Sequence, residues 1–339
     1  MLKRQCLWFE GASRVSVREE AMKQPAAGEV MVQSLLSAIS PGTEMMFYRG
    51  QIDEGAAVDT VLEGYRGGLS YPQRYGYASV GRIMAAGAGV DQAAIGRLVF
   101  AFVPHASLSC IKAELALAVP EGIPAEEAAF LASAETAVNL VLDSRPLLGE
   151  RVSIFGLGVI GLLTAGLCAA FPLARLTGWD LHPLRRAAAA TLGVAAADPV
   201  ADPPPVGTED LAVEVSGSAE GFRLALSSCG FAGRVVIGSW YGTGSRQHAF
   251  DTSFHRNRVR IIASQVSTID PELSGRWTRE RRHAEAWRAI RALRPSRLVT
   301  HRIPFSQAAE AYRLISEEPE KTIQVMLTHE SPEKPRAVP

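Results

Sequence analysis

The chain alternates short apolar runs with helical stretches between residues 125 and 238, and this rhythm constrains its fold most. The predicted strands are Arg151–Phe155, Arg175–Trp179, Leu211–Val215 and Arg234–Gly238. The predicted helices between them are Val159–Phe171, Pro183–Leu192 and Ala219–Cys229. Because the strand runs are continuously apolar, both faces of each strand are expected to be buried. Alternation of this kind predicts a doubly wound parallel sheet, an α/β fold.

A glycine motif, Gly156–Gly161 (GLGVIG), joins the first of these strands to the first helix. In the GxGxxG pattern the first glycine makes a tight turn. Gly158 then lets the backbone approach a pyrophosphate, and Gly161 lets helix and strand pack closely. The helix start, with the N–H groups of Val159 and Ile160, supplies donors and partial positive charge. This context predicts a dinucleotide site, the alternative being a glycine-rich turn without a cofactor.

The next predicted strand leads into Asp180, 24 residues after Gly156. An acidic residue at about this distance accepts hydrogen bonds from the adenosine ribose, and its charge repels the 2′-phosphate of NADP. NAD(H) is therefore expected to be favoured over NADP(H). Arg185 and Arg186 weaken that expectation, because a nearby arginine accommodates the extra phosphate.

The segments on either side of this region have a different rhythm. Residues 1 to about 120 contain short β-runs separated by Gly and Pro, the clearest being Glu29–Ile39, Ala78–Ala85 and Arg97–Val103. Residues 52–69 are predicted to form a surface loop. The last segment is predicted to contain helices at Thr278–Leu293 and Ser306–Ser316 and strands at Leu298–Val299 and Thr322–Thr328. The polar tail, residues 331–339, is expected to be disordered.

The composition excludes several classes of function. A chain of 339 residues suggests about two domains. Lys+Arg and Asp+Glu are both 35, so a net basic field for nucleic acid or an anionic membrane is absent. Four scattered cysteines exclude a disulfide scaffold and a CxxC-type zinc cluster. Without an apolar leader or a bilayer-spanning run, we expect a cytoplasmic protein that binds a small molecule, neither nucleic acid nor membrane.

Several motifs follow one another in an order typical of one superfamily. They run from Gly28–Val32 (GEVMV) through Gly76–Gly81 (GYASVG), the glycine motif and Val213–Gly217 (VEVSG) to Ile303–Tyr312. In this order the chain resembles the medium-chain dehydrogenase/reductase, or zinc-type alcohol dehydrogenase-like, superfamily. The resemblance implies a GroES-like β-rich catalytic domain made of residues 1–135 and 298–339. It also implies a Rossmann dinucleotide-binding domain, residues 136–297, and a homodimer.

The chain departs from the zinc-dependent members at all three catalytic ligand positions. Ser40 stands where those members have Cys, Tyr77 replaces His in Gly-His-Glu, and Ala132 lies near the third ligand position. A catalytic zinc needs three protein ligands, and a hydroxyl, a phenol and a methyl do not supply them. We therefore expect no metal. The segment Ile39–Glu44 (ISPGTE) is similar to a subgroup that includes the bacteriochlorophyllide hydroxyethyl dehydrogenase.

Without a Lewis acid, the substrate oxygen needs a hydrogen-bond donor. Tyr77 takes the place of a metal ligand, so its phenol either polarises a carbonyl and delivers a proton or is a packed aromatic ring. Ser40 and Thr43 are candidate proton relays or turn hydroxyls. Glu44 is a candidate general base, or a helix-start charge or internal ion pair. His105 is a candidate acid–base group, or an exposed loop residue.

The resemblance also implies residues on the cofactor side. Thr136 is implied to contact the nicotinamide side of the site. Glu135 is either a substrate-facing acid or an interdomain ion pair. Ser216, Gly238 and Trp240 follow predicted strands where the family contacts the cofactor, with core or dimer packing as the alternative role of Trp240.

Three functions remain open at this stage. The first is a zinc-independent, NAD(H)-linked oxidoreductase of EC 1.1.1 type that interconverts an alcohol and a carbonyl. The second is an NAD(P)H-dependent enone (C=C) reductase, and the third is a non-catalytic nucleotide-binding protein. A more remote alternative is a metal site rebuilt from Glu44, His105 or Glu135. A medium or bulky substrate is suggested by aromatic residues near the first motifs: Phe47, Tyr48, Tyr71, Tyr75 and Tyr77.

Overall fold

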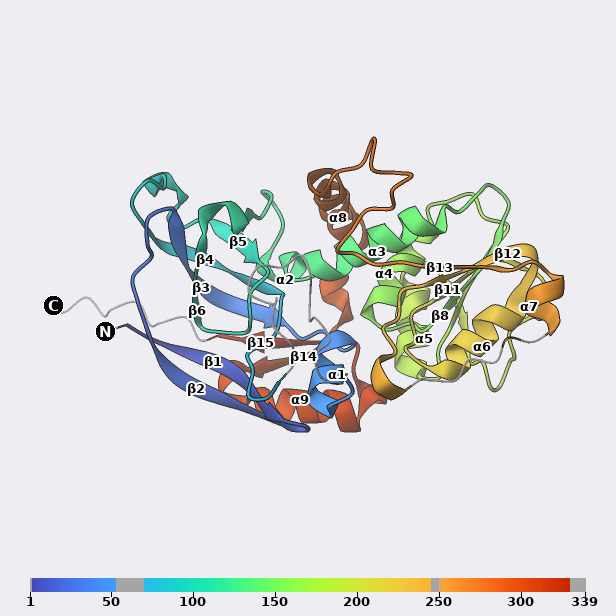
Figure 1. Ribbon diagram of the computed structural model, residues 1–339, viewed down its shortest axis with the longest axis horizontal. Helices are drawn as coiled ribbons and strands as arrows, with labels where there is room; N and C mark the ends of the chain where they lie inside the picture. Colours follow the sequence, from blue (N-terminus) through green and yellow to red (C-terminus); the bar gives the residue numbers. More distant parts are fainter. Residues whose placement is uncertain (1, 53–69, 245–249, 251, 330–339) are drawn as a thin grey trace.

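Two large β-sheets organise the protein. The computed structural model describes residues 2–52, 70–244, 250 and 252–329. The two sheets lie side by side along the long axis of the molecule, with α3 and α8 between them (Figure 1). One sheet is purely parallel and carries the glycine motif, while the other is mostly antiparallel. The α/β class predicted from the sequence is therefore confirmed.

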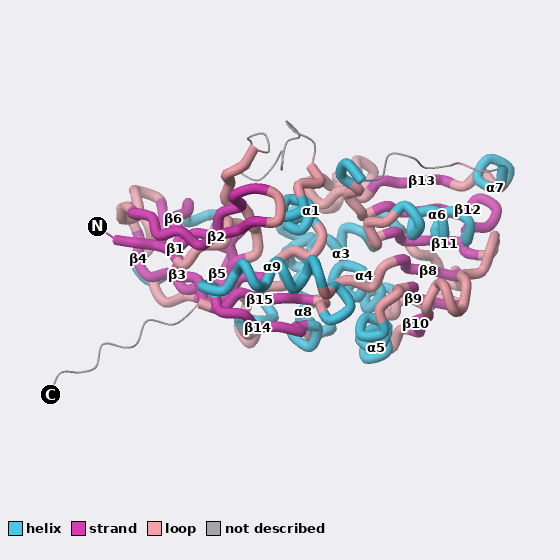
Figure 2. The backbone as a smooth tube through the Cα atoms, turned by 90° about the horizontal axis from the view of Figure 1, so that it is seen from below, coloured by secondary structure: helices cyan, strands magenta, loops and turns pink. Residues whose placement is uncertain are grey.

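The parallel sheet has six strands. In spatial order they are β10 (Ala195–Ala197), β9 (Arg175–Trp179), β8 (Arg151–Phe155), β11 (Glu209–Glu214), β12 (Cys229–Ile237) and β13 (Arg260–Ala263). Figure 2 shows this order as a ladder from β13 to β10. The chain winds outward in both directions from the pair β8–β11. In open parallel sheets, ligands bind at such a switch point, outside the carboxyl ends of the strands.

Helices cover both faces of the parallel sheet. The helices that follow its strands are α4 (Val159–Cys168), α5 (Pro183–Thr191), α6 (Ala219–Ser228) and α7 (Thr252–Arg256). Two further helices, α3 (Leu131–Ser144) and α8 (Arg279–Leu293), share one apolar core with α4 and α5. Side chains of α6 and α7 pack in a second core on the opposite face. Burial on both faces explains why the strand sequences are continuously apolar.

The second sheet joins the two ends of the chain. Its strands are β14 (Val299–Pro304), β15 (Gln324–Thr328), β3 (Glu29–Ala38), β4 (Ser79–Ala86), β5 (Leu98–Ala101) and β7 (Leu117–Ala118), with β6 (Leu108–Lys112) paired to β3. In the antiparallel pair β15–β3, Met326 lies opposite Ala38. The last segment of the chain therefore completes the sheet that the first segment begins.

A separate hairpin, β1 (Leu2–Gly11) and β2 (Arg14–Met22), packs beside that sheet. Two helices, α1 (Thr43–Arg49) and α9 (Ala308–Glu317), close an aromatic-rich core between the hairpin and the sheet. Phe9, for example, meets Tyr312 edge to face at 5.3 Å. The hairpin was not predicted, because charged residues along β2 hide its alternating pattern.

The helices and strands predicted from the sequence are present, and several begin or end at other residues than predicted. The strands Arg151–Phe155 and Arg175–Trp179 have the predicted bounds. A short helix, α2 (Ala125–Ala128), precedes α3, and β14 is longer than the two residues predicted. The predicted loop, residues 52–69, and the tail, residues 331–339, lie outside the described residues except for Ile52. No described helix is long and apolar enough to cross a bilayer.

The sheet edge at β13 is open to solvent in the single chain, with Ile261 37% exposed. Exposed backbone at a sheet edge is a surface on which another strand can pair. The homodimer implied by the resemblance stays a prediction.

One ion pair ties β12 to the segments that flank β8. Both Arg234 Nη atoms lie 2.7 Å from the Glu150 carboxylate, and the two side chains are only 11% and 12% exposed. Arg234 also donates to the carbonyl oxygens of Ser144 at 2.8 Å and Arg145 at 2.9 Å. The pair therefore joins the carboxyl end of α3 to the parallel sheet.

Replacing Arg234 should destabilise the fold. Arg234→Ala leaves the largely buried Glu150 carboxylate without its partner, so we expect the free energy of unfolding to fall by about 3 kcal/mol. Urea unfolding measures the loss. Arg313→Ala, which removes exposed ion pairs on α9, is the control and should leave the midpoint nearly unchanged. Equal midpoints for both variants would contradict this role of the buried pair.

Candidate active site

The glycine motif forms a cradle that is tight at its ends and open in its middle. Gly156 has φ +94°, and a Cβ there would lie 2.6 Å from the Cα of Ser216. At Gly161 a Cβ would lie 1.8 Å from the carbonyl oxygen of Gly156. At Gly158 a Cβ would meet nothing within 4 Å. The open face lies at the second glycine, where a phosphate must approach.

Among the residues that the structure describes, no side chain caps the start of α4. Gly158 is its N-cap and makes no side-chain capping bond, and its first turn contains no acidic residue. Val159 buries its side chain, whereas Ile160 is half-buried. A helix start of this kind binds anions through its N–H groups and dipole. The loop and the helix therefore fit the pyrophosphate of a dinucleotide.

Asp180 lies at the carboxyl end of β9, beside this cradle. Its carboxylate accepts hydrogen bonds from the backbone N–H of Leu157 and of His182, both at 2.8 Å. Arg185 Nη1 is 3.6 Å from the same carboxylate. The acid is thus fixed against the glycine motif, where the sequence predicted a ribose ligand.

The two arginines near Asp180 are engaged inside the protein. Arg185 donates to the carbonyl oxygen of Pro319 at 3.0 Å, which ties α5 to the last segment of the chain. Arg186 donates to the carbonyl oxygens of Asp180 at 2.8 Å and Leu181 at 2.7 Å. Both guanidinium groups hold backbone in place in this structure.

A buried carboxylate, Glu214, organises the end of β11. It accepts hydrogen bonds from the Ser216 N–H at 2.7 Å, from the Ser216 hydroxyl and from the Tyr241 hydroxyl. Burial and then the Glu214 charge raise the pKa of Tyr241 well above its usual range, so the phenol stays a donor. Sequence reasoning missed Glu214, although it lies inside the VEVSG motif that was quoted for the family.

Gly238 and Trp240 follow β12 at the same edge of the sheet. A Cβ at Gly238 would lie 2.7 Å from Leu140 Cδ2, so the strand end packs closely on α3. Trp240 is 42% exposed, and core packing is therefore excluded as its role. Its predicted contact with the cofactor stays a prediction.

Four polar side chains meet in a fully buried cluster on the other side of the site. His105 Nε2 lies 2.9 Å from Glu44 Oε2, and His105 Nδ1 lies 2.7 Å from the Ser37 hydroxyl. Tyr312 donates to Glu44, and the Ser40 N–H donates to Glu44 Oε1 at 2.8 Å. Burial and then the Glu44 charge raise the pKa of Tyr312 well above its usual range. We call these residues, Ser37, Glu44, His105 and Tyr312, the Glu44 cluster.

The Glu44 cluster corrects two predictions. Glu44 and His105 are both completely buried, so the direct acid–base contact with substrate predicted for them is contradicted. The alternative of an exposed loop histidine is wrong as well. The imidazole fits because residue 76 is glycine, with φ +116°, where a Cβ would lie 2.3 Å from His105 Cδ2. No sequence signal links Ser37 or Tyr312 to Glu44, since the pairs form only through the fold.

Ser40, Thr43 and Tyr77 lie at the margin of this cluster and are half-buried. The Tyr77 ring meets Tyr75 edge to face at 6.1 Å and packs against two apolar cores. Ser40 contributes its backbone N–H to Glu44, as described. The catalytic roles of these three residues stay predictions.

The aromatic residues offered as a sign of a bulky substrate are largely core. Phe47 and Tyr75 stack at 4.1 Å, and Phe47, Tyr48 and Tyr75 are at most 7% exposed. Tyr71, which is 39% exposed, donates its hydroxyl to the Phe47 carbonyl oxygen. The inference of substrate size from these rings is therefore corrected.

Glu135 is an ion-pair partner. Its Oε1 accepts from Arg282 Nη2 at 2.8 Å and Nε at 3.1 Å, and His283 Nε2 lies 3.1 Å away. Burial opposes ionisation, but His283 and then Arg282 lower the pKa of Glu135 overall. The substrate-facing alternative is therefore contradicted. Thr136 is half-buried and donates to the Ala132 carbonyl oxygen at 3.0 Å, within α3.

The residues proposed for a rebuilt metal site do not come together. Glu44 and His105 contact each other, whereas Glu135 is bound by Arg282 between α3 and α8. Across residues 2–52, 70–244, 250 and 252–329, no group of three His, Cys, Asp or Glu side chains suits a metal ion.

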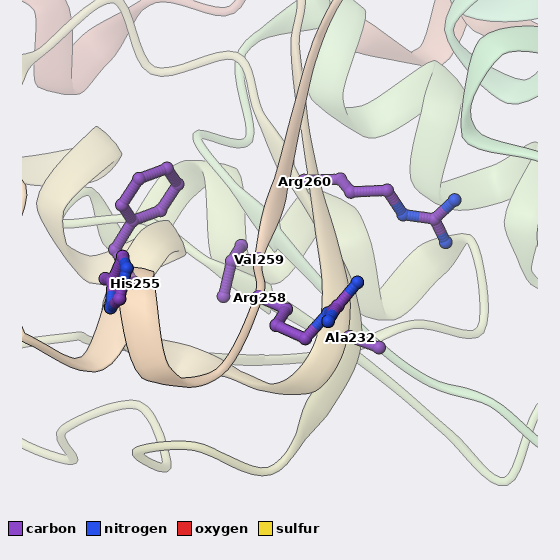
Figure 3. A pocket seen from close by; sticks show the side chains of 6 residues that line it. Ala232, His255, Arg258, Val259 and Arg260 are labelled. Atoms are coloured by element: carbon purple, nitrogen blue, oxygen red, sulfur yellow. The ribbon is translucent and has the colours of Figure 1, made fainter.

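Two cavities of about 490 Å³ lie at the margins of the parallel sheet, away from the predicted site. The first lies between β12, α7 and β13 and includes Ala232, His255, Arg258 and Arg260 (Figure 3). In that view His255 and Arg260 point to opposite sides of the chain that enters β13. Their side chains do not converge on one ligand.

Comparisons with known proteins agree with this geometry. No family model matches the chain. The chain is 26% identical to an uncharacterized zinc-type alcohol dehydrogenase-like protein, YphC, of Escherichia coli K12, over 91% of the chain and 94% of the relative. It is also 26% identical to 2-desacetyl-2-hydroxyethyl bacteriochlorophyllide A dehydrogenase of Rhodobacter capsulatus, over 94% of the chain and 96% of the relative.

Solved structures share the fold. The dehydrogenase RspB of Escherichia coli CFT073, complexed with NADH, matches with a TM-score of 0.75 and 18% identity, over 96% of this chain and 99% of that chain. A zinc-binding dehydrogenase of Sinorhizobium meliloti bound to NADP matches with a TM-score of 0.75 and 19% identity, over 97% and 100%. The GroES-like plus Rossmann architecture is thereby confirmed.

Two substitutions within the glycine motif should separate folding from binding. Gly158→Ala adds a methyl in open space, so we expect NADH binding to weaken by about tenfold with little change in stability. Gly161→Ala forces a methyl into the Gly156 carbonyl and should lower the free energy of unfolding by roughly 3 kcal/mol. NADH fluorescence titration and urea unfolding measure the two effects. Unchanged NADH affinity in Gly158→Ala would argue against this phosphate cradle.

His329 should make stability depend on pH. Burial and then nearby His105 lower the pKa of His329 to about 3. Below about pH 6.5 the unfolded chain therefore takes up a proton at His329 that the folded chain excludes. The free energy of unfolding decreases as the pH is lowered through this range. Between pH 7 and 5 the loss should be about 1–2 kcal/mol.

His329→Phe keeps the stacking on Phe305, which lies 4.4 Å away, and should flatten this dependence in urea titrations. His255→Gln, at an exposed histidine of α7, is the control and should follow the parent protein. Parallel curves for all three proteins would refute the assignment.

Proposed function

We propose that this chain, a homologue of the zinc-type alcohol dehydrogenase-like (medium-chain dehydrogenase/reductase) superfamily, carries out its chemistry without zinc and with NAD(H). Its relatives are dehydrogenases of alcohols and polyols, so the chain is an oxidoreductase that interconverts an alcohol and a carbonyl. A nicotinamide cofactor is also supported by structural neighbours that bind NADH or NADP. Zinc independence, the choice of NAD and the substrate class are the parts proposed.

The chemistry of the Glu44 cluster carries the proposal of zinc independence. By the resemblance, Ser40 and Tyr77 stand at two of the positions at which zinc-dependent members bind their catalytic zinc, and Ala132 lies near the third. The Glu44 carboxylate is hydrogen-bonded to the Ser40 N–H, to His105 and to Tyr312. Because Glu44 is buried, it cannot replace a missing zinc ligand. The hydroxyls of Ser40, Thr43 and Tyr77 therefore act as hydrogen-bond donors in this proposal.

Tyr77 is assigned the role of donor to the substrate oxygen. A phenol polarises a carbonyl and supplies its proton during reduction, and it accepts the proton in the reverse direction. The Ser40 and Thr43 hydroxyls are the proposed route of that proton to solvent. The Glu44 cluster fixes the backbone from which Ser40 projects, so it positions this route without touching substrate.

The cofactor would be held by residues of the parallel sheet. Gly158 and the start of α4 would bind the pyrophosphate, and Asp180 would bind the adenosine ribose. Thr136 is proposed to face the nicotinamide side. When bound, the nicotinamide ring donates or accepts the hydride.

NAD(H) is proposed over NADP(H) because of the charges around Asp180. Its carboxylate repels a 2′-phosphate, and both nearby arginines are engaged with backbone carbonyl groups. To bind NADP, Arg185 or Arg186 would first have to give up those contacts.

A medium or bulky substrate is proposed from the relatives' names. Relatives that match over about nine-tenths of the chain are named for a hydroxyethyl bacteriochlorophyllide and for a guloside, both larger than simple alcohols. Exposed Trp240 offers a ring against which such a substrate could stack.

Titration of the purified protein with NADH and NADPH, with metal content measured on the same sample, tests the proposal. We expect NADH to bind more tightly and zinc to be absent. A turnover screen with bulky ketones and secondary alcohols then gives a substrate. Stoichiometric zinc would overturn the proposal, and preference for NADPH with turnover of enones would favour reduction of C=C.

Tyr77→Phe should lower kcat about 100-fold while the Kd for NADH stays within about twofold, because one proton donor is lost. Tyr75→Phe removes a neighbouring hydroxyl from the core and is the matched control. Full activity of Tyr77→Phe would remove Tyr77 from the mechanism.

A further inference from the structure

We propose that Arg282 is a positioning residue for the nicotinamide half of the cofactor site. This inference rests on the proposed function, because it concerns the same cofactor. Arg282 is 2% exposed and is the largest fully buried side chain among the described residues. An arginine that deep in a protein needs partners for its charge and its donors.

All five N–H groups of the Arg282 guanidinium donate hydrogen bonds within the protein. Nε and Nη2 donate to Glu135, and Nη1 donates to Asn139 Oδ1 at 2.7 Å. The remaining donors bind backbone carbonyl groups, Nη2 that of Val266 at 2.6 Å and Nη1 that of Thr268 at 3.1 Å. Arg282 thus clamps the segment 264–268 between α8 and α3.

The segment 264–268 lies where the second half of a dinucleotide would sit. It follows the carboxyl end of β13, and the Ser264 N–H donates to the Ile237 carbonyl oxygen at the end of β12 at 2.8 Å. Asp180 on the β9 side marks the adenosine half, and the glycine motif after β8 marks the pyrophosphate. Continuing across the sheet past β11 places the other nucleotide over β12 and β13.

A second tether holds the same segment from α3. The Ser264 hydroxyl donates to Asp143 at 2.6 Å, and Asn139 Nδ2 lies 2.9 Å from Asp143 and 3.2 Å from Ser264 Oγ. Asn139 also accepts from Arg282, so the two tethers are one network. Thr136, the proposed nicotinamide contact, lies one turn before Asn139 on the same helix.

Arginine is required here because the clamp is planar and forked. A lysine at residue 282 would keep the charge beside Glu135 but has three donors on one nitrogen, so it cannot reach both Val266 and Thr268. Arg282→Lys therefore loosens the segment 264–268 while retaining the ion pair. Arg145 provides the control, since its ion pairs hold Asp270 and Glu272, which follow the segment 264–268 and lie outside it.

The experiment compares two ligands on the parent protein, Arg282→Lys and Arg145→Lys. NADH carries the nicotinamide, whereas ADP-ribose carries only the rest of the molecule. We expect Arg282→Lys to weaken NADH by about tenfold and to leave ADP-ribose within about twofold of the parent, while Arg145→Lys changes neither. Calorimetry measures the six affinities, and urea unfolding measures stability in parallel.

Equal weakening of NADH and ADP-ribose in Arg282→Lys, or no change in either, would overturn the proposal. Failure of the parent protein to bind either ligand would instead refute the proposed function. If Arg282→Lys does not fold, Ser264→Ala tests the second tether with a smaller change. It should weaken NADH about threefold and spare ADP-ribose, and an unchanged NADH affinity would again overturn the proposal.

Discussion

The need to pair buried charge governs the candidate site. Moving a carboxylate out of water costs several kcal/mol per ion, so each one must gather donors around it. Glu44, Glu135 and Glu214 are at most 4% exposed, and each collects its donors from separate parts of the chain. Glu44 fixes the backbone at Ser40, Glu135 holds Arg282 against α3, and Glu214 holds the turn at Ser216 together with Tyr241. The three segments that would surround a substrate and the reactive end of a cofactor are set by these buried acids.

α3 connects these groups. Its first turns carry Ala132, near the third ligand position that the resemblance implies, and Thr136, on the proposed nicotinamide side. Glu135 and Asn139, within one turn of Thr136, bind the Arg282 guanidinium, and the carboxyl end of α3 meets Arg234 of β12. A helix held along its whole length cannot shift to suit one partner alone. On the proposal made for Arg282, a change there would therefore alter the geometry where cofactor and substrate meet.

The Glu44 cluster fills the region beside Ser40. The Glu44 carboxylate is satisfied by an imidazole, a phenol and a backbone N–H. Gly76 makes room for the imidazole, because any side chain there would enter the His105 ring. The half-buried residues at the margin of this cluster, Ser40, Thr43 and Tyr77, all carry hydroxyl groups. Such a site handles one proton by hydrogen bonding, which suits hydride chemistry without a Lewis acid.

The sequence alone determined the parallel sheet, the glycine cradle and the position of Asp180, because those features depend on local periodicity and on close spacing along the chain. It could not show that His105 lies against Glu44, or that Arg282 binds Glu135, since these partners are 61 and 147 residues apart. It also misjudged Phe47 and Tyr75, because a ring in a core and a ring in a cleft look alike in a sequence. Burial decides the role of a polar or aromatic side chain, and burial is a property of the packed tertiary structure.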